Sequence, residues 1–537
     1  MNPDNGEIEP AVLADGGKPR HTALWLLLIL LLGFGLRATG LIWGQSFCYY
    51  AQGDGVQAYL TAVDYARGEP SAQYIGQPNF NEKSRLPGPL WAMFCVAGLR
   101  AGGSIEGVIW AVILLNTAFI YLAFLLAART IGVPAALWTA LFAATFPWVV
   151  HYSIFLYNPD VMPFLGTLLF LSLWQVVRRD RSRGIFWVMV LPLMSFQFHM
   201  SGLILIPVVI VVLWLCPSRL NFFWLAGGIV AGLALYAPYF YGEMAHGWGN
   251  TRGMISGGQG GYSVEALKVF SAPLSFLVNW THRWVRSPAE YAALGRACFG
   301  SYGLFLAVNF LSAVFAAFLI AGAFVTIKKS MNGFWRSPRA VFARSPGITF
   351  LTIIFVVPLI SGLASGKPFH TRYCLVFLAP LLALSAAAAT RWLTGPRTNR
   401  IFLALLVITT CANIWFVPAT YWSQKKLIEQ GPLFIPSFHK LEMVYQSLKA
   451  HAGKNRLIRV NDDTYLRALP PGDKFLHDAD MICTFVTVRE NENSPRQSVS
   501  NSVAIYNLCR ADQVRADDPA VAYREHGIAL VAQPATP

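Results

Sequence analysis

The feature that most constrains the fold is a series of apolar runs, each about twenty residues long, separated by short polar segments. A helix of that length matches the hydrocarbon core of a bilayer, whereas the strands of a membrane barrel would alternate apolar and polar residues. Trp, Tyr and Phe crowd the ends of the runs, as they do in the aromatic belts of membrane helices. Because 55% of the residues are hydrophobic and only 13% are charged, we expect a polytopic α-helical membrane protein.

The positive charge of the chain is spread in a way that argues against a nucleic-acid partner. A formal charge of +15 would suit nucleic-acid binding if it were gathered on one surface. It lies instead in short segments between apolar runs, such as "RRDRSR", where Lys and Arg mark the cytoplasmic side. We therefore expect the bilayer, and not nucleic acid, to be the partner of this charge.

Length and charge together predict how the chain crosses the membrane. The run 87–99 has about 13 residues, which is too short for a core of ~30 Å, and we expect a juxtamembrane helix there. The stretch 184–216 is flanked by Arg183 and Arg219, so both of its ends are expected inside, and it must form two short helices that turn near "FQFHMSG". The prediction is about eleven spans, with the N-terminus inside and the C-terminus outside. They are 22–43, 105–127, 131–150, 161–177, two within 184–216, 222–241, 303–327, 347–364, 371–392 and 401–419.

The predicted domains follow from these spans and from a change of composition near residue 421. We expect a cytoplasmic tail over 1–21 and a membrane domain over 22–420, with outer loops at 44–104 and 242–302. The second loop contains "GWGNTRGMISGGQGGYS", whose glycines indicate either a mobile lid or an unstructured connection. Residues 421–537 combine a helical pattern, "FHKLEMVYQSLKAH", with strand-like runs such as "MICTFVTV" and "SVAIYNLC". They predict a small α/β domain outside the membrane.

The predicted outer side gathers two carboxylates and a group of cations from loops that are far apart in sequence. Its members are Asp54 in "GDG", Lys83 and Arg85 in "NEKSRLPGP", Asp160 in "YNPD", and Lys367, His370, Arg372 and Tyr373 in "SGKPFHTRY". Taken singly, each charge is typical of a solvated loop or of a side chain that reaches to the membrane interface. Their concentration on one face, beside a short helix, indicates a functional site.

Two of the candidate residues also fit a purely structural role. Asp54 begins an amphipathic stretch, "VQAYLTAVDYAR", which predicts a helix along the membrane surface. An Asp at that position serves either as a helix N-cap or as a reactive carboxylate. His199, in the turn "FQFHMSG", is either a structural histidine or a contact to a bound lipid donor.

A lipid-linked phosphate donor is the substrate that such a face suits. It would arrive through the bilayer, and its phosphate would bind Lys, Arg or His at the depth of the headgroups. Displacing that phosphate from a sugar builds negative charge on the leaving oxygen, which fixed cations stabilise. A carboxylate would accept the proton of the attacking hydroxyl or orient it.

Four segments, in this order, carry a resemblance to a known family: "GDGVQAYLTAVDYARGEP", "KSRLPGPLW", "YNPD" and "SGKPFHTRYCLVFLAPLLAL". They resemble the GT-C class of polyprenol-linked glycosyltransferases, and within it the branch of protein O-mannosyltransferases and lipid A aminoarabinose transferases. The resemblance covers most of residues 20–420. It implies an inverting transfer of a sugar from a polyprenyl-phosphate donor to a glycolipid, polysaccharide or protein of the cell envelope. It also implies a bacterial inner-membrane protein whose active site and C-terminal domain are periplasmic.

The resemblance assigns roles to the candidate residues. Asp54 becomes the catalytic carboxylate, and Asp160 becomes the second acidic residue of the catalytic pair, which positions the acceptor or the donor. Lys83 or Arg85 becomes a donor-phosphate ligand, and the late group adds Lys367, His370 and Arg372, followed by Tyr373. The first motif is Asp-Gly, where the family more often has an acidic residue after the Asp, so we predict no metal requirement and no cofactor.

Two other functions fit parts of the pattern. A transporter or flippase for a lipid-linked substrate would place ionisable residues or broken helices near mid-bilayer, often in repeats. Arg37 is the only basic residue well inside a predicted span, and the sequence shows no repeat. A polymerase or ligase that uses a diphosphate-linked glycan would use the same cations, and it remains an alternative.

Overall fold

The computed structural model describes only part of the chain. Its described residues are 19–43, 58, 61–62, 65–66, 68, 73–77, 84–102, 105–178, 183–216, 221–257, 263–278, 288–394, 399–429, 506–510, 521–525 and 528–532. They belong to two compact units. A helical unit contains the helices up to Ser423, and a second unit contains three strands near the C-terminus.

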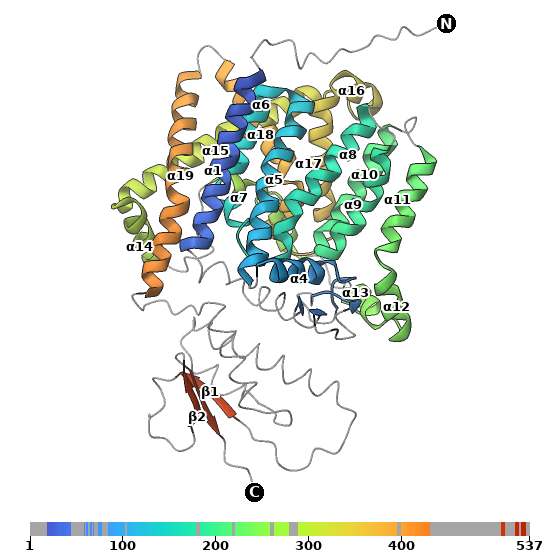
Figure 1. Cartoon of the computed structure of the whole chain (residues 1–537). Coiled ribbons are helices and arrows are strands. Elements are labelled where there is room, and N and C mark those ends of the chain that lie inside the picture. Colours follow the sequence, from blue (N-terminus) through green and yellow to red (C-terminus); the bar gives the residue numbers. More distant parts are fainter. Residues whose placement is uncertain are drawn as a thin grey trace. The chain divides into compact units, whose positions relative to one another are not determined.

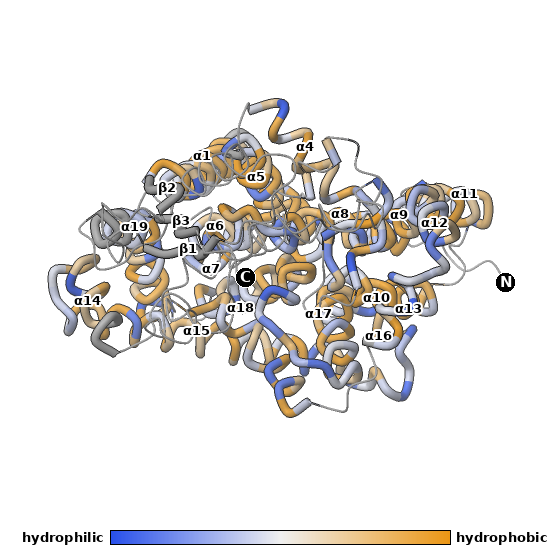
Figure 2. The backbone as a smooth tube through the Cα atoms, turned by 90° about the horizontal axis from the view of Figure 1, so that it is seen from below, coloured by the Kyte–Doolittle hydropathy of each residue, from blue (hydrophilic) through white to orange (hydrophobic). Residues whose placement is uncertain are grey.

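Long apolar helices form most of the helical unit. Within the described residues, seven are long and apolar enough to cross a membrane, or up to eight if a bent pair is one span. The seven are α1 (Pro19–Trp43), α5 (Ile105–Ile131), η2 with α8 (Asn158–Val161 and Met162–Arg178), α15 (Tyr302–Ser330), α17 (Pro346–Ala364), η7 with α18 (Thr371–Phe377 and Leu378–Thr394) and α19 (Asn399–Glu429). Seen along the helix axes, their tubes are mostly hydrophobic, and hydrophilic segments lie mainly in the connections (Figure 2).

Two of the predicted spans are broken by proline. The run 131–150 forms α6 (Val133–Thr145) and α7 (Pro147–His151), so the prediction of one continuous span is wrong there. The run 222–241 forms α11 (Phe222–Ala234) and α12 (Ala237–Ala245), which are bent by 47°. Pro147 and Pro238 each lack the N–H that would bond a carbonyl of the preceding helix, and they are the first residue of α7 and the second residue of α12.

The stretch 184–216 folds as two short helices, as predicted. They are α9 (Gly184–Phe198) and, after the 3₁₀ helix η3 (Met200–Ile204), α10 (Leu205–Leu215). His199 joins them in an extended conformation, with φ −156° and ψ 145°. α6, α9 and the η3–α10 segment are apolar but shorter than the long helices, so the count of about eleven spans stays a prediction.

α8 and α18 form the centre of the helical unit. Of the apolar window of α18, 83% is buried, against 28% for α15 at the periphery. Gly166 allows η7 to approach α8 closely, because an added Cβ would collide with the carbonyl oxygen of Val376. This close packing fixes the segment that carries Arg372.

Arg37 is fully buried inside α1, and its contacts explain why it lies there. Its guanidinium donates to the carbonyl oxygens of Gly33 at 3.0 Å and of Ala143 at 2.9 Å. Ala143 lies four residues before Pro147, which has no N–H to bond its carbonyl. Arg37 therefore supplies the donor that the proline removes, and it stabilises the C-terminal end of α6.

Short helices gather at one end of the helical unit. α4 (Leu90–Gly102) lies there together with α12 and α13 (Gly249–Gly257), and α16 (Pro338–Arg344) lies at the opposite end (Figure 1). α4 has 13 residues and does not qualify as a full span, which agrees with the predicted juxtamembrane helix. We call this the α4 end of the helical unit.

The predicted outer loop 242–302 contains much regular structure. Its helices are α13, η5 (Val264–Val269), η6 (Pro273–Leu277) and α14 (Pro288–Phe299). Most of "GWGNTRGMISG" belongs to α13, so the expectation of an unstructured glycine-rich segment is wrong there. The reversal from α12 into α13 uses positive φ at Gly247 (66°) and Trp248 (62°).

The described part of the second unit is a small antiparallel sheet. β1 (Tyr506–Arg510), β2 (Val521–Glu525) and β3 (Ile528–Ala532) lie in the order β1-β3-β2. β1 overlaps the predicted strand "SVAIYNLC", with Tyr506 opposite Ala532 of β3. The predicted helix "FHKLEMVYQSLKAH" and strand "MICTFVTV" lie outside the described residues, so the α/β domain stays a prediction.

Candidate active site

The turn that carries Asp160 is fixed by hydrogen bonds to two helices, one to a side chain of α5 and one to a backbone carbonyl of α9. Asp160 lies in η2, is fully buried, and donates its N–H to the carbonyl oxygen of Tyr157 at 3.0 Å. Its own carbonyl accepts from the amide of Asn116 in α5 at 2.8 Å. The amide of Asn158 donates to the carbonyl of Phe198, the last residue of α9, at 2.7 Å. The position of Asp160 is therefore set by α5 and α9.

Arg372 of η7 lies across the same turn. Its Nη1 donates to the hydroxyl of Tyr157 at 2.5 Å. Its guanidinium carbon lies 5.8 Å from the centre of the Tyr157 ring and 5.6 Å from that of Tyr373, which is within cation–π distance. Asp160 and Arg372 are 212 positions apart in the numbering, and the packing of η2 against η7 brings their segments together.

Two histidines join this group through Tyr373. The rings of His199 and His370 each lie 5.6 Å from the ring of Tyr373. The N–H of Ser201 points to Nδ1 of His199 at 3.2 Å, and a backbone N–H can only donate. Nδ1 is therefore the acceptor, and Nε2 of the neutral ring carries the hydrogen. His199 also lies within electrostatic reach of Arg372.

The turn with Lys367 and His370 is fixed by the segment that begins η5. The N–H of Ser263 donates to the carbonyl of Gly366 at 2.8 Å, and the N–H of Phe369 donates to the carbonyl of Glu265 at 3.3 Å. Both bonds join backbone to backbone. The half-buried cations Lys367 and His370 therefore occupy a turn whose path is determined by η5.

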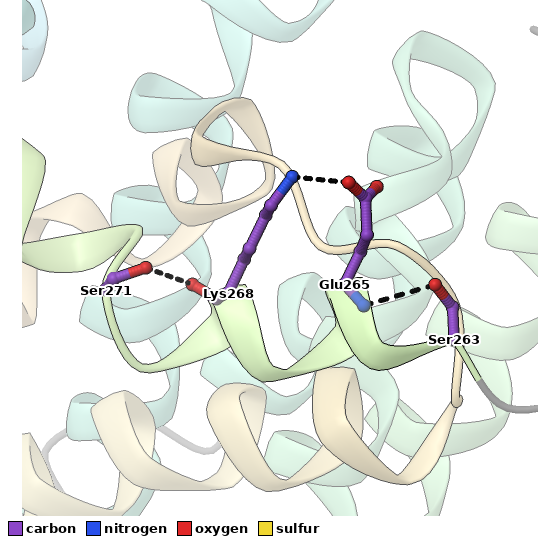
Figure 3. Close-up of polar contacts among 4 residues, drawn as sticks. All are labelled: Ser263, Glu265, Lys268 and Ser271. Atoms are coloured by element: carbon purple, nitrogen blue, oxygen red, sulfur yellow. Dashed lines mark hydrogen bonds and ion pairs between the residues drawn. The ribbon is translucent and has the colours of Figure 1, made fainter.

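A carboxylate lies beside this turn. Glu265 pairs with Lys268 at 2.6 Å on the exposed side of η5, and its N–H donates to the hydroxyl of Ser263 (Figure 3). The hydrogen bond and charge of Lys268 lower the pKa of Glu265, and the nearby His370 lowers it further. Glu265 therefore places a negative charge next to the cationic turn.

The segment that contains Arg85, just before α4, packs against the end of α9. Gly88 has a φ of 126°, and an added Cβ would collide with the side-chain amide of Gln197 in α9. Trp91 packs edge-on against Phe198, with ring centres 6.3 Å apart. The segment that contains Arg85 therefore lies against the last turn of α9, two residues from His199.

The last residues of α9 contact several parts of the candidate site. We call Gln197, Phe198 and His199 the α9 terminus. It contacts the Gly88 segment, the ring of Trp91, the amide of Asn158 and the ring of Tyr373. Sequence reasoning identified His199 but missed the roles of Gln197, Asn158 and Tyr157. Asn158 and Tyr157 belong to the "YNPD" motif, whereas Gln197 has no local signal.

Two of the predicted site residues, Asp54 and Lys83, lie outside the described residues. Of the predicted amphipathic helix, residues 58, 61–62 and 65–66 are described and helical. Ala58, Thr61 and Ala62 are buried, so this helix presents small residues to the protein. Among the described residues, no three His, Cys, Asp or Glu side chains gather as metal ligands.

Comparison with known proteins identifies the fold. No family model and no curated relative matches the sequence. Among solved structures, ArnT from Cupriavidus metallidurans bound to undecaprenyl phosphate matches with a TM-score of 0.55 and 15% identity, over 96% of this chain and 98% of that one. The same protein in its apo state also gives a TM-score of 0.55, with 13% identity and the same coverage.

The chain has the GT-C fold of ArnT. The resemblance inferred from the four sequence motifs is therefore confirmed at the level of the fold. A crystal structure of an oligosaccharyltransferase from Archaeoglobus fulgidus matches more weakly, with a TM-score of 0.48 and 12% identity over 92% of this chain and 70% of that one.

Proposed function

We propose that the protein is a membrane glycosyltransferase that moves a sugar from a polyprenyl-phosphate donor to an acceptor outside the cytoplasm, with inversion. The observation that carries this proposal is the convergence of Arg372, His370 and His199 around Tyr373, beside the buried turn of Asp160. The convergence occurs in a chain with the fold of ArnT, which was crystallised with undecaprenyl phosphate.

The cations would bind the phosphate of the donor and stabilise it as it leaves. Arg372 is the central ligand, because a guanidinium can donate two parallel hydrogen bonds to phosphate oxygens. The hydroxyl of Tyr157 and the ring of Tyr373 fix the orientation of the Arg372 guanidinium before the donor binds. Nε2–H of His199 is a further donor, and His370, Lys367, Arg85 and Lys83 complete the positive field. Such fixed charges stabilise negative charge that develops on the leaving oxygen.

The two carboxylates would have different roles. Asp54, which the four-motif resemblance assigns as the catalytic residue, would accept the proton of the attacking acceptor hydroxyl or orient it. Asp160 is fully buried, and its backbone is bonded to Tyr157 and Asn116. We propose that Asp160 positions the turn that presents Tyr157 to Arg372 of η7. In this proposal Asp160 does not touch the substrate.

The proposed setting is the inner membrane of a bacterium, with the α4 end facing the periplasm. The charge pattern of the loops supports this orientation, because the "RRDRSR" segment follows α8 at its end remote from Asp160. The acceptor would be a glycolipid, a polysaccharide or a protein of the cell envelope.

The direct test incubates the purified protein with polyprenyl-phosphate sugars and follows the release of polyprenyl phosphate. We expect Asp54→Asn to reduce release at least 100-fold, the scale of losing a catalytic base. The matched control is Asp64→Asn, in the same segment, which should retain activity. Normal turnover by Asp54→Asn would refute the catalytic assignment. Movement of the lipid across vesicles without any release would indicate a flippase instead.

A further inference from the structure

The backbone around Arg85 is held from two sides, as in a strand of a sheet. On one side, Leu86 donates its N–H to the carbonyl of Gln77 at 3.0 Å and accepts from the N–H of Gly76 at 2.9 Å. Successive residues of an extended chain direct their backbone groups to opposite sides. The N–H and carbonyl of Arg85 therefore face away from residues 76–77 and need partners elsewhere.

The side chain of Asn250 supplies both partners. The N–H of Arg85 donates to Oδ1 of Asn250 at 2.6 Å, and Nδ2 of Asn250 donates to the carbonyl of Arg85 at 3.1 Å. A primary amide carries a donor and an acceptor in one plane, and only Asn and Gln offer that combination. The side chain of Asn250 thus makes the two hydrogen bonds that a neighbouring strand would make to Arg85. Asn250 lies 165 residues away in the sequence, in α13.

Asn250 is itself held by a buried carboxylate. Glu243 of α12 is 1% exposed and accepts from the N–H groups of Asn250 at 3.3 Å and Thr251 at 2.7 Å. A carboxylate at the N-terminus of a helix satisfies its first donors and is favoured by its dipole. The hydroxyl of Tyr239 accepts from Nδ2 of Asn250 at 3.2 Å and donates to Glu243 at 3.4 Å. The amide of Asn250 is therefore fixed in orientation.

The pair of helices that carries Asn250 is anchored to the rest of the α4 end. We call α12 and α13 together the α12–α13 hairpin. The amide of Gln197 in the α9 terminus donates to the carbonyl of Leu235 at the bend before α12, at 2.9 Å. The ring of Tyr74 stacks on that of His246, with centres 5.3 Å apart, and its hydroxyl lies 3.3 Å from Nδ1 of the same histidine. The hairpin therefore contacts the two segments that lie against residues 85–88, which are residues 73–77 and the α9 terminus.

We propose that Asn250 is the positioning residue of Arg85, and that the α12–α13 hairpin thereby sets the affinity of the protein for a phosphate-bearing lipid. The inference rests on the proposed function, because it takes Arg85 as a phosphate ligand. Its physical basis is that an extended backbone with both of its polar groups bonded fixes the point from which the Arg85 side chain extends. Ordering the backbone in advance reduces the entropy lost on binding.

The test uses the full chain in nanodiscs, with undecaprenyl phosphate as the probe. The variants are Asn250→Ala and Asn250→Asp; the second keeps the shape of the side chain but removes its donors. The matched control is Asn221→Ala, which removes another asparagine from a helix N-terminus, where Oδ1 accepts from Phe223 and Trp224. Amide hydrogen exchange of the peptide 84–88 measures the order of the Arg85 backbone, independently of any activity.

We expect exchange in that peptide to be about tenfold faster in Asn250→Ala, which is the scale of one lost hydrogen bond. Undecaprenyl phosphate should bind about tenfold more weakly to both Asn250 variants, and normally to Asn221→Ala. In an Arg85→Ala background, Asn250→Ala should change the affinity less than twofold, because it acts through Arg85.

Two results would overturn the inference in distinguishable ways. Unchanged exchange at 84–88 in Asn250→Ala, or additive losses of affinity in the double variant, would show that Asn250 does not act through Arg85. Faster exchange combined with normal lipid binding by Arg85→Ala would instead show that Arg85 binds no phosphate. That second outcome would refute the role of Arg85 in the proposed function, and with it the inference.

Discussion

At the scale of single residues, Arg372 shows what the sequence can and cannot predict. Its motif, "KPFHTRY", identified it as a cation of the site. Nothing in the sequence indicated that Tyr157 would accept its hydrogen bond, because the two residues are 215 positions apart and lie at the ends of different spans. Contacts of this kind depend on how helices pack, which no local pattern records.

Changing Arg372 tests its role in donor binding. We expect Arg372→Ala to weaken the binding of undecaprenyl phosphate roughly 10- to 100-fold. This factor corresponds to the free energy that hydrogen bonds to a charged group contribute. Arg372→Lys should recover only part of that loss, since an ammonium cannot bond phosphate and Tyr157 with one planar group. Titration calorimetry in detergent measures both. Arg391→Ala, in the last turn of α18, the helix that follows η7, is the control and should bind normally.

At the scale of helices, the apolar runs predicted which segments are helical, and the prolines determined where they break. Pro147 and Pro238 are visible in the sequence, but many membrane helices tolerate proline without breaking, as α17 does with Pro358. The break before Pro147 persists because Arg37 bonds the carbonyl that the proline leaves without a donor. That compensation could not be predicted from either segment alone.

The pair of Arg37 and Pro147 gives a stability prediction. We expect Arg37→Leu to lower the free energy of unfolding by about 1–3 kcal/mol, because the carbonyl of Ala143 loses its partner. Pro147→Ala restores a backbone N–H four residues after Ala143, so the double variant should recover part of the loss. Thermal unfolding in detergent, followed by light scattering, measures the series. Strictly additive losses would contradict the proposed compensation.

A second prediction at this scale concerns the contact of α8 with η7. Gly166→Ala would push η7 away from α8, at a cost of about 1–3 kcal/mol for overpacking. Arg372 should then move relative to Tyr157, and undecaprenyl phosphate should bind at least fivefold more weakly, a ratio worth ~1 kcal/mol. Gly35→Ala in α1 is the control, because an added Cβ meets nothing within 4 Å there. Equal effects of the two substitutions would argue against the role of Gly166.

At the scale of the whole molecule, the sequence motifs predicted a fold that alignment did not detect. The order of the four motifs sufficed, although no family model matches and ArnT shares only 15% identity. The number of spans was harder to predict, because α6, α9 and α10 are too short to be distinguished from re-entrant helices by length alone. The catalytic assignment of Asp54 stays a prediction, since that residue lies outside the described part of the chain.

Cysteine labelling tests the predicted sidedness. Trp335, in the turn before α16, is 93% exposed, and Val264, at the start of η5, is 78% exposed. In intact spheroplasts, we expect a membrane-impermeant maleimide to label Val264→Cys, and to label Trp335→Cys only after permeabilisation. The unsubstituted chain gives the background from its native cysteines. Labelling of both positions from the same side would contradict the orientation proposed for the α4 end.

The α9 terminus has a consequence for how variants of this protein are read. The amide of Gln197 bonds the carbonyl of Leu235, the ring of Phe198 packs against Trp91, and the carbonyl of Phe198 accepts from Asn158, so these residues support several segments at once. A mutagenesis screen scored by loss of product would therefore recover inactive alleles at these positions as often as at a true ligand. Only a measurement that separates misplacement from lost chemistry, such as rescue at high donor concentration, would sort the two kinds of allele.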